Sequence, residues 1–129
     1  MATFIWSGSG DLQSVLGEQT TTVGEEVNFY GSISALPSTE TTLITVNLTA
    51  GQQFAIIGFT VWADIDAEWI IKVDGVPKAG TRTTASNLSN NVEWTHYLNV
   101  AGPATVTLNG IHTYSASEVL KANLIGRIR

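Results

Sequence analysis

From residue 41 onward, short runs of alternating hydrophobic and polar residues are separated by turn residues, and this pattern predicts a series of β-strands. The runs that we interpret as strands span residues 42–48, 53–63, 68–74, 92–100, 105–115 and 119–128. Asp74-Gly75 is a hairpin-type turn, and Asn109-Gly110 marks a bulge within the fifth run. No long stretch has a helical period. We therefore predict an all-β chain that forms an antiparallel β-sandwich of jelly-roll type.

The alternation also assigns faces to the predicted strands. Residues 53–63 are hydrophobic on both faces, which is typical of a central strand, with Phe54, Ile56 and Trp62 sharing one face and Phe59 and Val61 the other. In residues 92–100, the pattern places Trp94 and His96 on the core face and leaves Tyr97 exposed. The predicted core faces of the remaining strands include Ile44, Val46, Leu48, Trp69, Ile71, Val73, Leu120, Ala122 and Leu124. Residues 76–91 are small and polar, and we interpret them as a loop that is long for a compact domain.

The first 40 residues differ from the rest of the chain. They contain five acidic residues and no Lys or Arg, so the whole net charge of −5 lies there. Two hydrophobic clusters, Phe4-Ile5-Trp6 and Val27-Asn28-Phe29-Tyr30, are separated by Gly, Ser and Thr without a sustained period. We predict an extended N-terminal arm over residues 1–40 that binds another subunit, followed by the sandwich domain at residues 41–129. The predicted interface residues are Phe4, Ile5, Trp6, Phe29, Tyr30 and the exposed Tyr97.

Composition narrows the classes of partner. Only 13% of the residues are charged, which predicts that much of the surface contacts other proteins. The net negative charge without a basic cluster argues against nucleic-acid binding. The chain has no cysteine, no secretory signal pattern and no apolar run near the ~20 residues of a membrane span. We expect synthesis in a cytoplasm, no membrane contact, and stability that comes from packing or from partners.

The residues that could carry chemistry form no catalytic motif. Asp64, Asp66 and Glu68 alternate, with Asp74 nearby, and could offer oxygen ligands to calcium, but the pattern favours the simpler role of keeping one end of the sandwich soluble. His96 and His112 are the only histidines, and His96 has the pattern of a core histidine bonded to the backbone. No nucleophile, phosphate-binding or metal-hydrolase spacing is present. We predict no enzymatic activity, no cofactor and no metal site.

The aromatic residues leave a second class of function open. Trp62, Trp69, Trp94 and Tyr97 could form a platform on which sugars stack. However, Trp69 and Trp94 lie on the hydrophobic phase of their strands, which favours a place in the core. Carbohydrate binding therefore remains an alternative.

Three segments, residues 42–52, 54–64 and 68–75, resemble the small β-sandwich virion proteins of tailed bacteriophages. That group includes capsid decoration (cement) proteins and head-fibre or tail-fibre modules. The resemblance implies a virion protein without catalytic residues, present in many copies, often as a trimer, that locks neighbouring capsid subunits together. The expected function is thus capsid decoration, with the major capsid protein or other virion proteins as partners. A tail, baseplate or fibre component is the nearest alternative.

Overall fold

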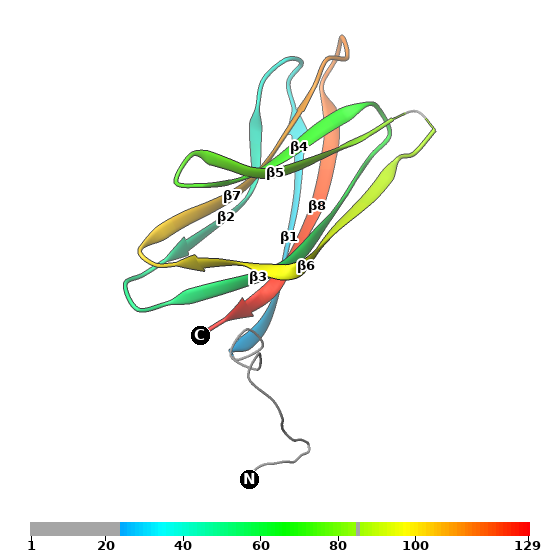
Figure 1. The fold of residues 1–129 in the computed structure, drawn as a ribbon. Helices are drawn as coiled ribbons and strands as arrows, with labels where there is room; N and C mark the ends of the chain where they lie inside the picture. Colours follow the sequence, from blue (N-terminus) through cyan, green and yellow to red (C-terminus); the bar gives the residue numbers. More distant parts are fainter. Residues whose placement is uncertain (1–23, 85) are drawn as a thin grey trace.

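The computed structural model describes residues 24–84 and 86–129, and its regular structure there consists of β-strands (Figure 1). The strands are β1 (Glu25–Ala35), β2 (Thr41–Leu48), β3 (Gln53–Ala63), β4 (Ala67–Val73), β5 (Val76–Thr83), β6 (Ser89–Ala101), β7 (Ala104–His112) and β8 (Glu118–Ile128). Within these residues, no helix is long and apolar enough to cross a membrane.

The strands form two four-stranded antiparallel sheets. The first sheet has the order β1-β8-β3-β6, and the second has the order β2-β7-β4-β5. Among the described strands, only β4 and β5 follow each other within one sheet, and every other connection crosses between the sheets. The predicted antiparallel β-sandwich is confirmed. Its jelly-roll type stays a prediction, with which eight strands in two sheets agree.

The hydrophobic core fills the space between the two sheets. Alternate residues of the strands point inward, as a two-layer sandwich requires. The largest fully buried side chains are Trp69, Phe54, Phe59, Ile56 and Ile71. The predicted core positions of β2 and β8 are confirmed, since Ile44, Val46, Leu48, Leu120, Ala122 and Leu124 are buried. So is the predicted core position of Trp69.

A bulge in β3 changes the faces that strict alternation predicts. The pairing with β8 runs from Ile56↔Gly126 directly to Gly58↔Ile125, so Ile57 has no partner. Phe59 and Val61 are therefore buried on the same side as Phe54 and Ile56, and Trp62 lies on the opposite, outer face. The predicted pairing of Trp62 with Phe54 and Ile56 was wrong for this reason.

A larger irregularity interrupts β6. Its pairing with β3 passes from Gly58↔Glu93 to Ile56↔Leu98, which leaves residues 94–97 without partners on β3. Trp94 packs half-buried against Phe59, with ring centroids 5.8 Å apart. His96 is exposed and Tyr97 is half-buried, so the predicted faces of both residues were wrong. Alternation cannot assign faces across an insertion of this size.

Residues 25–35, within the predicted arm, form the first strand of the domain. β1 pairs with β8 from Glu25↔Ile128 to Ala35↔Glu118 without interruption. Phe29 meets Phe54 edge to face at 6.0 Å, so it packs against the core and is not an isolated anchor. The remaining interface residues of the predicted arm, Phe4, Ile5 and Trp6, lie outside the described residues.

Residues 76–83 form an edge strand and not a loop. β5 pairs with β4 from Ala67↔Thr83 to Val73↔Val76. In this strand Pro77 cannot donate a backbone hydrogen bond, Lys78 is charged and Gly80 has no side chain. Such residues are typical of an edge strand, and they explain why the sequence pattern did not predict β5. The bulge was predicted at Asn109-Gly110, but the pairing of β7 with β4 is regular at these residues. The register shift lies instead in the neighbouring strand β2, at Leu43.

Candidate binding surfaces

Three connections at one end of the sandwich, the end at the top of Figure 1, each carry one exposed hydrophobic residue. This end carries the connections β1–β2, β3–β4, β5–β6 and β7–β8. Leu36, Leu88 and Tyr114 lie on three of these connections and are 62%, 42% and 52% exposed. We call these three residues the apolar loop end. Exposed hydrophobic residues at one end of a small domain are candidates for an interaction surface.

Backbone hydrogen bonds fix the connections that form this end. The Ser38 N–H donates to the His112 carbonyl at 2.7 Å, which joins the β1–β2 connection to the end of β7. The Ala63 N–H donates to the Leu88 carbonyl at 3.1 Å, which holds the β5–β6 connection against the end of β3. Hydrogen bonds therefore hold the backbone of the connections that carry these exposed residues.

His112 is the buried histidine of the fold and supports the same end. Its Nε2 lies 2.8 Å from the Ala35 carbonyl, and its Nδ1 accepts from the Tyr114 N–H at 3.1 Å. Because Nδ1 accepts, Nε2 carries the proton and donates to Ala35. The sequence predicted this role for His96, which is instead exposed, because the irregularity of β6 was not visible in the pattern.

The carboxylates that could have formed a calcium site do not converge. Glu68 forms an ion pair with Arg82 at 3.2 Å. Asp74, at the opposite end of the second sheet, accepts from the Thr105 N–H at 2.9 Å. In the described part of the chain, no three His, Asp or Glu residues lie close enough together to hold a metal ion.

A pair of aromatic rings lies on the outer face of the first sheet. Tyr30 on β1 is 59% exposed, and its ring centroid lies 6.1 Å from that of Trp62 on β3, with the planes tilted by 37°. β8 runs between these two strands, pairing Asn123 with Tyr30 and Lys121 with Trp62. Tyr30, a predicted interface residue, thus lies on the surface of the domain and not on an arm.

A hollow adjoins this aromatic pair. It has a volume of about 220 Å³ and is lined by Trp62, Ala63, Asp64, Val119 and Lys121. One side of the hollow is formed by Val119, the second residue of β8, which pairs with Ser34 of β1. Sequence reasoning placed Trp62 among possible sugar-stacking residues, but it missed Tyr30 as its partner and Lys121 as its neighbour.

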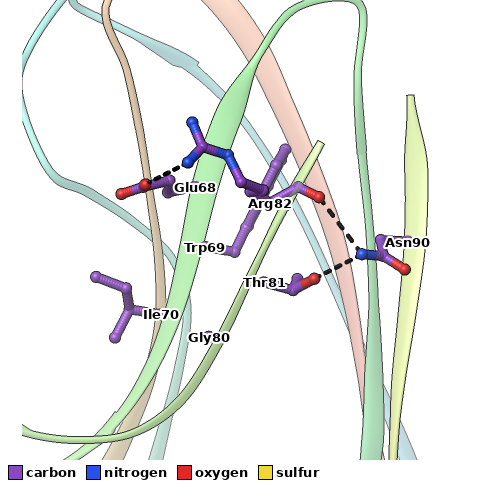
Figure 2. A pocket seen from close by; sticks show the side chains of 7 residues that line it. All are labelled: Glu68, Trp69, Ile70, Gly80, Thr81, Arg82 and Asn90. Carbon is purple, nitrogen blue, oxygen red and sulfur yellow. Dashed lines mark hydrogen bonds and ion pairs between the residues drawn. The ribbon is translucent and has the colours of Figure 1, made fainter. Parts of the chain in front are cut away.

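A larger hollow of about 430 Å³ lies where β4, β5 and β6 meet (Figure 2). The Asn90 amide donates to Thr81 Oγ1 at 2.7 Å and to the Arg82 carbonyl at 3.4 Å, and Arg82 pairs with Glu68. Its aromatic residue, Trp69, is fully buried and offers no exposed ring face. The polar groups of this hollow bind mainly one another, so it is the weaker candidate for a ligand site.

The sequence matches no known protein family and no curated protein. The solved structures with a distant likeness include the following two. A de novo designed double-stranded β-helix is 13% identical, with 78% of this chain and 99% of that chain covered and a TM-score of 0.36. An insecticidal delta-endotoxin of Bacillus thuringiensis is 12% identical, with 80% of this chain covered and a TM-score of 0.40, and this chain spans 20% of that toxin. Neither likeness carries a functional argument.

Proposed function

We propose that this chain is a non-enzymatic virion structural protein, a capsid decoration (cement) protein that bridges neighbouring capsid subunits. The observation that carries the proposal is the apolar loop end, where three well-anchored connections expose Leu36, Leu88 and Tyr114 to solvent. Exposed hydrophobic side chains at one end of a domain are available for a partner to cover. The low content of charged residues, 13%, supports the same conclusion.

The proposed partners are the major capsid protein and further copies of the chain, with a trimer favoured. The apolar loop end would insert its side chains between shell subunits, where buried hydrophobic and aromatic side chains contribute most of the binding energy. A tail, baseplate or fibre component would use the same surface on another part of the particle. Detection of the chain in separated heads and tails distinguishes these two locations.

The test is co-sedimentation of the purified chain with phage heads that lack it. We expect the wild-type chain to pellet with the heads. We expect the double variant Leu36→Ser/Tyr114→Ser to stay in the supernatant, because it removes two of the three exposed hydrophobic side chains. Val76→Ser is the matched control, since Val76 is similarly exposed at the β4–β5 hairpin, away from this end.

Two outcomes would contradict the proposal. One is a wild-type chain that does not bind heads or any other virion part. The other is a double variant that binds as well as the Val76→Ser control, which would place the contact elsewhere on the molecule. Circular dichroism of all three proteins establishes that each is folded.

A further inference from the structure

We propose that the outer face of the first sheet carries a binding site for a neutral saccharide, centred on Tyr30 and Trp62. This site is separate from the proposed capsid contact at Leu36, Leu88 and Tyr114. The site does not depend on the proposed function, because its argument rests on the aromatic pair and the adjoining hollow.

The first step of the argument is the position of the rings. The bulge at Ile57 turns Trp62 away from the core, and the pairing of β1 with β8 brings Tyr30 to the same outer face. With centroids 6.1 Å apart and planes tilted by 37°, the two rings lie next to each other on the side of the sheet that covers β8. The faces of aromatic rings are electron-rich and attract polarised C–H groups, which a pyranose presents on its apolar side.

The second step is the charge of the hollow beside Trp62. Asp64 and Lys121 line it together, and neither forms an ion pair with another residue in the described ranges. The carboxylate accepts hydrogen bonds and the ammonium donates them, so together they match adjacent hydroxyl groups. Their opposite charges cancel, which favours a neutral ligand over an anion or a cation.

The third step is the surrounding surface and the size of the hollow. Thr60 donates to Asn91 Oδ1 at 2.7 Å on the same face, and the Asn123 side chain lies between the two aromatic strands. Amides and hydroxyls around an aromatic surface provide further donors and acceptors for sugar hydroxyls. The volume of about 220 Å³ is below the roughly 300–1,000 Å³ of drug-sized pockets. One sugar ring in the hollow with a second ring over Tyr30 fits this arrangement.

The experiment is an NMR titration of the full chain with three defined hexasaccharides: cellohexaose, chitohexaose and maltohexaose. We expect at least one of them to shift the Trp62 indole N–H and the backbone amides near Lys121 in a saturable manner. The Trp69 indole serves as an internal control, because it is buried in the core and should not move.

Variants assign the binding to this face. We expect Trp62→Ala to weaken binding roughly tenfold or more, since an aromatic anchor dominates such a site. Trp94→Ala, which removes an aromatic residue from the β6 side of the sheet, should leave binding unchanged. A second matched pair keeps the fold intact: Asp64→Asn should weaken binding, whereas Asp66→Asn should not, because Asp66 does not line the hollow.

The proposal is overturned if none of the three sugars shifts the Trp62 indole up to about 50 mM, a range that detects millimolar dissociation constants. It is also overturned if Asp64→Asn and Asp66→Asn bind equally. The capsid-binding double variant Leu36→Ser/Tyr114→Ser should bind sugar like the wild type. A failure of one proposal can therefore be told from a failure of the other.

Discussion

At the scale of single residues, His112 connects three parts of the chain. Its ring bonds the end of β1 through Ala35 and the β7–β8 connection through Tyr114, while the imidazole itself is only 2% exposed. A buried side chain that satisfies two backbone groups stabilises the fold through both packing and hydrogen bonding. The outcome of replacing it therefore differs sharply from that of replacing the exposed His96.

We expect His112→Ala to lower the free energy of unfolding by about 2–4 kcal/mol, because it leaves a cavity and an unpaired Ala35 carbonyl. His96→Ala should change the same free energy by less than about 0.5 kcal/mol, as is usual for exposed positions. Urea denaturation followed by tryptophan fluorescence measures both. Equal effects of the two substitutions would show that the hydrogen bonds of His112 contribute little.

Gly58 is a second position at which a single residue constrains the local structure. A β-carbon there would overlap with the Val92 carbonyl oxygen of the neighbouring strand. We expect Gly58→Ala to destabilise the protein by about 1–3 kcal/mol, since β3 and β6 would have to separate. Ser32→Ala on the exposed face of β1 is the comparison, and it should be neutral within about 0.5 kcal/mol. Thermal melts of the two variants test this, and a neutral Gly58→Ala would mean that the bulge region shifts freely.

At the scale of elements, β1 determines where the domain begins. It covers the free side of β8 and contributes Ala35 and Phe29 to the core. We expect a chain that begins at Gly24 to keep the wild-type circular dichroism spectrum. A chain that begins at Ser38 should be unfolded or insoluble, because it exposes the backbone of β8 and part of the core. A folded chain from Ser38 with an unchanged melting temperature would contradict this assignment of β1.

The elements also show what the sequence could predict. Strands β4 and β8 alternate, and β2 alternates from Ile44 onward, so the positions of these strands and their buried faces were predicted correctly. β1 and β5 are edge strands, and both were missed because their patterns are weak: β1 has the small residues Gly31 and Ala35 at buried positions, and β5 contains Pro77 and Gly80. The faces of β3 and β6 were mistaken because a bulge shifts the phase without leaving a sequence signal. Tyr30 lies on a strand that the pattern missed, and Trp62 lies beyond the bulge that reverses the faces of β3. The sequence pattern alone therefore could not predict that these two rings are neighbours.

At the scale of the whole molecule, hydrophobic packing outweighs charge. Within the described residues the ion pairs are Lys72–Glu40 at 2.7 Å and Arg82–Glu68 at 3.2 Å, and the second pair is exposed. Pairs of this kind contribute about 0–1 kcal/mol each and weaken in salt. The three residues of the apolar loop end are uncharged, whereas Asp64 and Asp66 lie on the β3–β4 connection at the same end. Salt screens the repulsion between such carboxylates, so it should not weaken association through this end.

If the proposed homo-oligomer also forms through the apolar loop end, we expect it to persist when sodium chloride is raised from about 0.05 to 0.5 M, a range over which the Debye length falls several-fold. Light-scattering mass on a sizing column measures this. The Leu36→Ser/Tyr114→Ser variant should elute as a monomer at both salt concentrations. An oligomer that dissociates in salt would point to an electrostatic interface elsewhere.

The place of β8 in the first sheet affects how the protein can fold while it is being synthesised. β8 lies between β1 and β3, so two strands made early by the ribosome are joined by one made late. Until residues 118–128 have emerged, β1 has no neighbour in its sheet, and β3 has only β6. Such distant pairing slows folding and leaves unpaired strands open to aggregation. The cell that synthesises this chain must therefore keep most of it soluble before any stable sandwich can exist.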